Sequence, residues 1–447
     1  MDSARRFPFH PRVEVAARGD RKLRLRDATA MAVGGMIGGG IFSVLGVTVG
    51  LAGHLAWVAF AIGGLIALMT AHSFGALSMR AGRSGGLFVF LADAGHRSLG
   101  AMLSWLLMFG YVIALAVYGF TFGHYAANVL GLPEVAADAG SVLVLAVFLL
   151  INLRGVGASA WSEDLVVAVK LLVLALIAGV GLAHFSPERL APASDLTVAG
   201  VFVAASSIFV AYEGFELLSY DYDDIERPRR TLPRALYLSV GLVAVIYVVV
   251  TIGTQMLVSD DQIVAQREVA FATAGQAALG TAGYWIATLG ALLASSSAIN
   301  ATLFSTARQM HEVASAGELP AVFARSRRGL PVSALVLLAV FGAAFAMLPD
   351  IGSLLAFGSA MFLMVFGVTN ALAFLVLRGA LSRAVSGIGA LACTAALVTL
   401  VVQQLASSPS TVLLMAVCVL LVAALRWGFV RRRSHRSASD ADDRERR

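Results

Sequence analysis

Repeated apolar runs of about 20 residues constrain this chain more than any other feature of its sequence. A helix of that length crosses the roughly 30 Å hydrocarbon core of a bilayer. The residues are 59% hydrophobic and only 13% charged, whereas a soluble domain is about a quarter charged. The sequence therefore predicts an all-α polytopic membrane protein embedded in a lipid bilayer. The twelve expected transmembrane helices are roughly 28–51, 54–78, 100–127, 140–155, 162–184, 199–221, 234–258, 282–310, 331–348, 353–377, 386–404 and 410–430.

The composition argues against several other classes of protein. Cys393 and Cys418 both lie in apolar runs, so neither a disulfide framework nor a thiolate metal site is indicated. The net charge of +6 comes from arginines in short loops and tails, which does not indicate a nucleic-acid partner. The histidines fall on separate segments, so no catalytic residues, metal or cofactor are expected. Residues 1–26 are polar and lack the apolar core of a signal peptide.

Arginines alternate between the loops, and this pattern predicts the orientation of the chain. Basic residues, which are retained on the cytoplasmic side, gather at the N terminus, after the even-numbered spans and in the C-terminal tail. An even number of spans in the cell (cytoplasmic) membrane, with both termini cytoplasmic, satisfies these clusters. The expected organisation is an N-terminal tail over 1–27, a transmembrane domain over 28–430 and a disordered C-terminal tail over 431–447. Residues 84–96 are too apolar for a solvated loop and are expected to form a short in-plane helix.

The first expected span contains the run GGMIGGGIF, in which Gly38, Gly39 and Gly40 fall midway along the helix. Each glycine costs roughly 1 kcal/mol relative to alanine in a helix, and glycine reaches backbone angles that other residues avoid. Close packing through small residues is one explanation. Three successive glycines point in three directions, however, and cannot all serve one packing face. The run therefore favours an interruption of the helix at membrane depth.

The sixth expected span carries Glu213 and Gly214 near its middle, and Glu216 follows. A carboxylate at this depth is costly and indicates a functional site, although a glutamate that only faces a water-filled vestibule is an alternative. Interruptions in spans one and six, five spans apart, indicate two inverted repeats with a binding site at the midplane.

A broken pair of helices offers a site for a zwitterion. A half-helix that begins at a break presents N–H groups to an anion, and one that ends there presents carbonyls to a cation. We therefore expect a carboxylate to bind the amides around Gly38–Gly40. The ammonium group is expected on carbonyls around Met36, Val210 and Glu213.

Lysine is nearly absent from the chain, since only Lys22 and Lys170 are found among the 33 basic residues. Lys170 lies near the centre of span five. A buried lysine can lose its proton, whereas arginine stays charged, so Lys170 suits a proton carrier. Snorkelling to an interface is the alternative, but either end of the span is about 12–15 Å away. In span eight, Ser296 and Ser297 could offer hydroxyls to Lys170 or bond their own helix backbone.

These motifs resemble those of the amino acid–polyamine–organocation transporter superfamily. GGMIGGGIF is similar to its first-helix signature, G-x-x-I-G-x-G-I-F. FVAYEGFE, followed by IERPRRTLPRAL, is similar to its sixth helix and the loop after it. SSSAINATLFSTARQMHEVASAGELP in span eight and the SGG of Ser84 to Gly86 also fit the family pattern. The likeness covers residues 28 to about 380 in the same order.

The resemblance implies a leucine-transporter-like fold whose first and sixth helices are broken. Its two inverted five-helix repeats would cover about 28–184 and 199–377, with two extra helices at about 386–430. It also implies that Gly39 and Gly40 hold the substrate carboxylate.

Proton-coupled members of the superfamily can carry a lysine on helix five where sodium-coupled relatives hold a cation, and Lys170 matches that position. Glu216 aligns with an acid that takes part in coupling in some members. The expected substrate-binding residues are Met36, Ile37, Gly38, Gly39, Gly40, Phe209, Val210, Ala211, Tyr212 and Glu213. The expected proton-coupling residues are Lys170, Glu216, Ser296 and Ser297.

Two residues depart from the family pattern. Val210 stands where many relatives place a large aromatic gate, so either Phe209 or Tyr212 takes that role or the gate differs. Glu213 replaces the usual apolar residue before the glycine, so it either attracts a cationic side chain or titrates itself.

The leading hypothesis is a secondary active transporter that carries an amino acid together with a proton by alternating access. An exchanger, or a carrier of polyamines or cationic amino acids, is the alternative. Glu213 and an acidic run favour that alternative, although a solvated helix end also explains the run, which is Asp221, Asp223, Asp224 and Glu226. A channel would not need paired interruptions. The expected partners are a small-molecule amino acid and a proton, and the sequence leaves monomer and loose homodimer open.

Overall fold

A computed structural model describes residues 22–154, 160–190, 198–327, 330–348 and 350–445. Within these ranges the chain forms α-helices and short 3-10 helices, with isolated β-bridges but no sheet. The 3-10 helices are η1 (Gly53–Leu55), η2 (Pro187–Leu190), η3 (Phe209–Tyr212), η4 (Phe215–Ser219) and η5 (Tyr222–Asp224). The α-helices are α1 (Leu25–Met36), α2 (Gly40–Ala52), α3 (Ala56–Ala81), α4 (Gly86–Asp93), α5 (Arg97–Leu130), α6 (Glu134–Leu153), α7 (Ala160–Ala183), α8 (Val198–Ser207), α9 (Pro228–Leu257), α10 (Asp260–Ala265), α11 (Ala270–Ser315), α12 (Val332–Ala346), α13 (Ile351–Val376), α14 (Ala380–Ser407) and α15 (Pro409–Glu445).

The predicted all-helical, multi-pass architecture is confirmed. Nine helical stretches of the described residues are long and apolar enough to cross a membrane, or ten if the bent pair Ala199–Ser207 and Phe209–Ser219 forms one span. One of these stretches, Gly40–Ala81, contains both α2 and α3, and α12 is a shorter apolar helix. The total of twelve separate spans stays a prediction.

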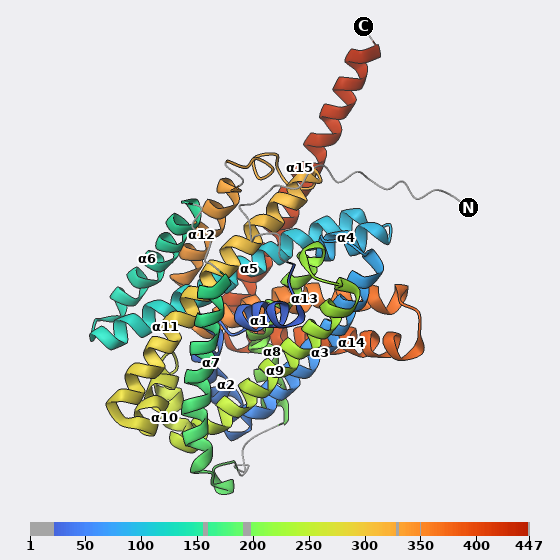
Figure 1. Cartoon of the computed structure of the whole chain (residues 1–447). Helices are drawn as coiled ribbons and strands as arrows, with labels where there is room; N and C mark the ends of the chain where they lie inside the picture. Colours follow the sequence, from blue (N-terminus) through green and yellow to red (C-terminus); the bar gives the residue numbers. More distant parts are fainter. Residues whose placement is uncertain (1–21, 155–159, 191–197, 328–329, 349, 446–447) are drawn as a thin grey trace.

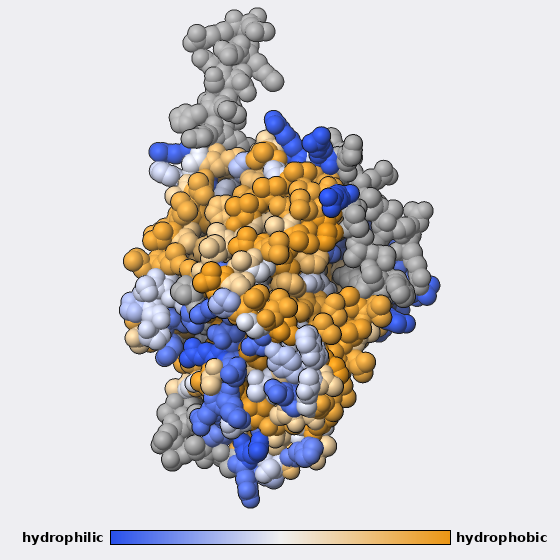
Figure 2. Space-filling view, turned by 90° about the vertical axis from the view of Figure 1, so that its left-hand side faces the viewer, coloured by the Kyte–Doolittle hydropathy of each residue, from blue (hydrophilic) through white to orange (hydrophobic). Residues whose placement is uncertain are grey.

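Two helices form the centre of the bundle, and the last helices lie at its edge. The most apolar stretch of α5 is 83% buried and that of α13 is 72% buried, whereas the corresponding stretch of α15 is only 17% buried. Large apolar side chains on the outer faces, such as Leu172, Leu375 and Leu391, are exposed. Figure 2 shows a broad apolar area across one face, with hydrophilic residues gathered above and below it. A patch of this size suits contact with lipid rather than with water.

Short helices mark the two ends of the bundle. The short helix predicted within 84–96 is present as α4, which lies at the same end as the protruding C-terminal part of α15 (Figure 1), while its in-plane orientation stays a prediction. α10 lies at the opposite end. α15 continues as helix to Glu445, and the disordered C-terminal tail expected over 431–447 stays a prediction. The tail contains neither glycine nor proline, so nothing in its sequence stops a helix that is already formed from propagating.

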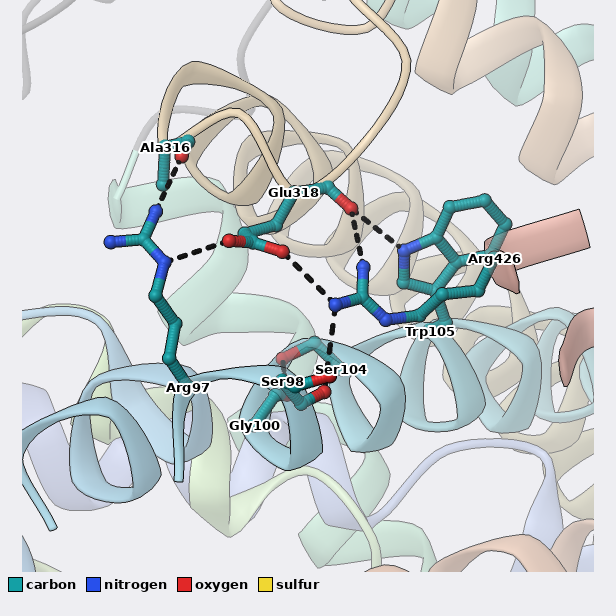
Figure 3. A network of polar contacts seen from close by, with 8 residues as sticks. All are labelled: Arg97, Ser98, Gly100, Ser104, Trp105, Ala316, Glu318 and Arg426. Carbon is teal, nitrogen blue, oxygen red and sulfur yellow. Dashed lines mark hydrogen bonds and ion pairs between the residues drawn. The ribbon is translucent and has the colours of Figure 1, made fainter. Parts of the chain in front are cut away.

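A nearly buried ion network ties α15 to the rest of the bundle (Figure 3). Glu318, in the turn after α11, accepts from Arg97 Nε at 2.7 Å through Oε1 and from Arg426 Nη2 at 3.0 Å through Oε2. Its backbone carbonyl also accepts from Trp105 Nε1 at 3.0 Å. The side chains of Glu318 and Arg426 are only 10% and 6% exposed. One carboxylate thus joins α5, α11 and α15.

We expect Glu318→Gln to lower the free energy of unfolding by about 3 kcal/mol, because it leaves a buried guanidinium without its carboxylate. Asp93→Asn is the matched control. Its ion pair with Arg83 is 42% and 37% exposed, so its loss should cost at most about 1 kcal/mol. Unfolding of both purified variants in detergent measures the difference, and equal losses would contradict a structural role for the network.

Candidate functional site

The first predicted interruption lies between α1 and α2. α1 ends at Met36 and α2 begins at Gly40, with Ile37 outside helical geometry at φ −82° and ψ 72°. The Gly38 amide donates to the Met36 carbonyl at 2.9 Å instead of continuing the helix. Since the first N–H groups of a helix have no partner within it, the start of α2 presents amides at the break. The Gly38 amide already donates to the Met36 carbonyl, so the amides of Gly39 and Gly40 are the first ones that an anion could reach.

The three glycines of this break each meet a different neighbour. A Cβ on Gly38 would stand 2.7 Å from Ala298 Cβ and 2.8 Å from the Tyr118 ring. A Cβ on Gly39 would stand 2.6 Å from Ser295 Oγ, and one on Gly40 would lie 3.7 Å from Ala211. The glycines therefore serve close packing as well as the interruption, and they do so in several directions.

The second predicted interruption follows α8. The helix ends at Ser207, and the chain bends by 55° between the segments on either side of Ile208. Glu213 is extended at φ −69° and ψ 158°, and Gly214 adopts φ 111°, in the left-handed region that favours glycine. The residues around Glu213 thus leave helical geometry at the position that the sequence indicates.

The two interruptions touch each other through their backbones. A Cβ on Gly214 would stand 3.1 Å from the carbonyl carbon of Gly35. The Tyr247 hydroxyl on α9 lies 2.9 Å from the Met36 carbonyl oxygen and 3.0 Å from the Ala211 carbonyl oxygen. One phenol of α9 therefore joins the ends of both broken helices.

Glu213 and Glu216 are both buried but are held differently. Glu216 accepts from the Tyr111 hydroxyl at 2.6 Å and from the Gly214 amide at 2.8 Å, so both oxygens are used. Glu213 accepts from the Tyr118 hydroxyl at 2.6 Å through Oε1, while its Oε2 is buried without a hydrogen-bond partner among the described residues. Glu216 thus caps the second interruption, whereas Glu213 keeps one oxygen for another group.

Lys170 reaches the first interruption from α7. Its side chain is fully buried, and Nζ donates to the carbonyl oxygens of Gly34 at 2.6 Å and Ile37 at 2.5 Å. In an unbroken helix the Gly34 carbonyl would accept from the amide of Gly38, but that amide has turned to Met36. The lysine therefore replaces the missing helical donor and places a cation at the C-terminal end of α1, where the helix dipole favours one.

The aromatic residues predicted at the site, Phe209 and Tyr212, contact neighbouring helices. Tyr212 donates to the Phe60 carbonyl of α3 at 2.6 Å, and the Phe209 ring packs against Phe366 of α13. Val210 lies against Gly358 of α13, where its Cγ2 would be 2.9 Å from an added Cβ. These side chains pack the second interruption against α3 and α13.

The serines of α11 differ in burial. Ser296 and Ser297 are half-buried, whereas Ser295 is buried with its hydroxyl beside Gly39. Sequence reasoning also missed Ser359 of α13, which accepts from the Val210 amide at 2.9 Å and donates to the Ser207 carbonyl at 2.8 Å. Thr121, which lies against Gly39, was missed as well. Among the described residues, no group of three or more His, Cys, Asp or Glu could hold a metal ion.

We expect Gly38→Ala to lower stability by about 1–3 kcal/mol, because the new methyl group would meet Ala298 and Tyr118 below contact distance. Gly40→Ala is the matched control, since its methyl group would lie 3.7 Å from Ala211. Thermal unfolding of both variants in detergent tests this contrast, and an equal effect at both positions would contradict the packing account.

Comparisons with known proteins show the family of the chain. The family model described as amino acid permease matches residues 23–436. The chain is 31% identical over 351 residues to an uncharacterized protein of Methanocaldococcus jannaschii, covering 78% of this chain and 81% of that protein. It is 28% identical over 314 residues to the inner membrane transport protein YbaT of Escherichia coli, covering 69% and 73%.

A further relative is the human Asc-type amino acid transporter 1, which is 28% identical over 383 residues, covering 80% of this chain and 71% of that protein. These relatives and the family model describe transporters rather than enzymes. The chain is a multi-pass membrane protein and belongs to the amino acid permease family.

Proposed function

We propose that this protein is a secondary active transporter that carries an amino acid together with a proton by alternating access. The observation that carries the proposal is the position of Lys170, whose ammonium group holds the Gly34 and Ile37 carbonyls at the first interruption. A relative named as an Asc-type amino acid transporter supports an amino acid substrate. Another relative, of Bacillus subtilis, is named as a methylthioribose transporter, so family membership alone does not fix the substrate.

The two interruptions supply complementary groups for the common part of an amino acid. The amides that begin α2, around Gly39 and Gly40, would bind the carboxylate at a helix N-terminus. The ammonium group would bind carbonyls at the broken ends, from Met36, Val210 and Glu213. The Met36 carbonyl already accepts from the Gly38 amide and the Tyr247 hydroxyl, so the ammonium group would replace or share these donors.

The proton would be carried on Lys170. A charge-assisted hydrogen bond is roughly twice as strong as a neutral one, so loss of the proton would weaken the hold on the Gly34 and Ile37 carbonyls. The C-terminal end of α1 would then be less firmly attached to α7. A change in this attachment biases the balance between outward-facing and inward-facing states, which couples the proton to the direction of transport.

The helix order supports twelve spans arranged as two inverted repeats. Counting α1 with α2 as the first span and α8 with η3 and η4 as the sixth, the spans between them are α3, α5, α6 and α7. The interruptions then occupy the first position of each five-helix half, the arrangement found in inverted-repeat transporters.

Substitution of Lys170 tests the coupling. We expect Lys170→Ala in proteoliposomes to lose the accumulation that a pH gradient drives. For comparison, a gradient of about one pH unit supports at most about tenfold accumulation by the unmodified protein through one-proton symport. Lys22→Ala is the matched control, because the other lysine is exposed near the start of α1. Uptake of labelled amino acids with and without the gradient gives the readout.

Lys170→Arg sharpens the same experiment. Arginine keeps a charge but does not release its proton, so this variant should also lose the response to the gradient. Proton-driven accumulation by the Lys170→Ala protein would remove the residue from the mechanism. Counterflow without net uptake by the unmodified protein would instead favour an exchanger.

Chemical labelling tests the proposed orientation, in which both termini are cytoplasmic. A membrane-impermeant maleimide should label Glu134→Cys in intact cells, because α6 would begin on the outer side. Arg230→Cys, at the start of α9, should react only after the cells are opened. The unmodified chain gives the background, since Cys393 is buried and Cys418 is half-buried. The reverse pattern would mean the opposite orientation.

A further inference from the structure

The carboxylate of Glu213, at the second interruption, has a buried oxygen without a hydrogen-bond partner among the described residues. The residue is 2% exposed, and the oxygen without a partner is Oε2. None of the ion pairs formed by the described residues involves Glu213. A buried carboxylate with one open oxygen is costly to maintain, so its retention beside a binding site points to a ligand that completes it.

Glu213 lies beside the same glycines that form the proposed substrate site. Its Oε1 accepts from the Tyr118 hydroxyl, and the ring of Tyr118 packs directly against Gly38. The backbone of the next residue, Gly214, contacts Gly35 and Met36. The Tyr118 side chain of α5 therefore connects the carboxylate to Gly38 in the link between α1 and α2.

The neighbouring carboxylate cannot play the same part. Both oxygens of Glu216 are used, by the Tyr111 hydroxyl and the Gly214 amide. The cation of the site, Lys170, donates to the Gly34 and Ile37 carbonyls at the first interruption. Of the two glutamates at the second interruption, only Glu213 thus has an oxygen left for a ligand.

The balance of charge indicates what kind of ligand this is. The backbone groups of the two interruptions match the carboxylate and the ammonium group of a zwitterion, which has no net charge. The side chain of Glu213 adds one further acceptor that a neutral amino acid does not use. A ligand with a second ammonium group supplies both the missing donor and the missing positive charge.

We propose that Glu213 is a specificity-determining residue that selects amino acids with a basic side chain, of the diamino monocarboxylic type. The inference rests on the proposed amino acid transport and names its substrate class. The amides at the start of α2 require the ligand to keep a carboxylate, which distinguishes a diamino acid from a polyamine. Tyr118 is a positioning residue, since its hydroxyl fixes the carboxylate through Oε1.

Binding of two matched probes to the purified full-length protein tests the proposal. L-lysine and L-norleucine share the same carbon chain, but only L-lysine has the ε-ammonium group. We expect L-lysine to bind at least about tenfold more tightly, as a hydrogen bond between charged groups would give. In Glu213→Gln the ratio of the two dissociation constants should fall to near one. Glu134→Gln, which removes an exposed carboxylate at the start of α6, should keep the ratio of the unmodified protein.

Other outcomes would overturn the proposal in distinguishable ways. Equal affinity of the unmodified protein for both probes would reject Glu213 as a selector, although amino acid transport would still stand. This measurement does not depend on whether any variant folds. If putrescine, which has no carboxylate, bound as tightly as L-lysine, the ligand's carboxylate would not contribute to binding. Loss of proton dependence for L-norleucine uptake in Glu213→Gln would make Glu213 a proton carrier instead. If neither amino acid binds the unmodified protein, the proposed function itself fails.

Tyr118→Phe provides a second variant that leaves the charge in place. It frees Oε1 without removing the carboxylate, so the preference for L-lysine should weaken by a smaller factor than in Glu213→Gln. A purely structural role for Tyr118 would lower the affinity for both probes equally and leave their ratio unchanged, which would contradict its assignment as a positioning residue.

Discussion

Backbone groups at membrane depth have no water to bond to, and the architecture around the two interruptions follows from that constraint. Unwinding two helices releases carbonyls and amides that side chains of other helices must satisfy. Lys170 of α7 takes the carbonyls at the end of α1, and Tyr247 of α9 bridges both interruptions. Ser359 of α13 bonds an amide and a carbonyl of the second interruption. Residues of α7, α9 and α13 therefore hold the interruptions in place, while among the described residues one buried oxygen of Glu213 has no hydrogen-bond partner.

The sequence predicted the interruptions because their signals are local. A glycine triplet and a glutamate next to glycine are unusual inside an apolar span, and the structure breaks both helices at these positions. Lys170 was also recognisable, as a charged residue far from either end of its span. The contribution of Ser359, Tyr247 and Thr121 could not be predicted, because a serine, threonine or tyrosine in an apolar helix is ordinary. What decides their role is which way each helix is turned about its axis, and packing sets that rotation.

The α11 serines illustrate how much this rotation matters. Adjacent residues of a helix point about 100° apart, so a prediction that is wrong by one residue selects a different face. The sequence left open whether Ser296 and Ser297 offer hydroxyls to Lys170 or bond their own helix backbone, and the structure places the adjacent Ser295 against Gly39. The same limit applies to the second interruption, where the sequence left open whether Phe209 or Tyr212 serves as an aromatic gate or the gate differs. The Tyr212 hydroxyl is anchored to α3, because a buried hydroxyl must find an acceptor, and the Phe60 carbonyl provides one.

Close packing gives the interruptions a mechanical role in addition to their chemical one. Gly38 and Gly39 bring the link between α1 and α2 against Tyr118 and Thr121 of α5 and against Ala298 and Ser295 of α11. A core packed this tightly does not deform continuously but moves between discrete arrangements. In the proposed mechanism, a ligand that draws the amides of α2 toward it would press on α5, where the Tyr118 hydroxyl is hydrogen-bonded to the carboxylate of Glu213. The proposed selector of the ligand's side chain, Glu213, and the backbone proposed to bind the carboxylate common to all amino acids would thus be connected through the ring of Tyr118.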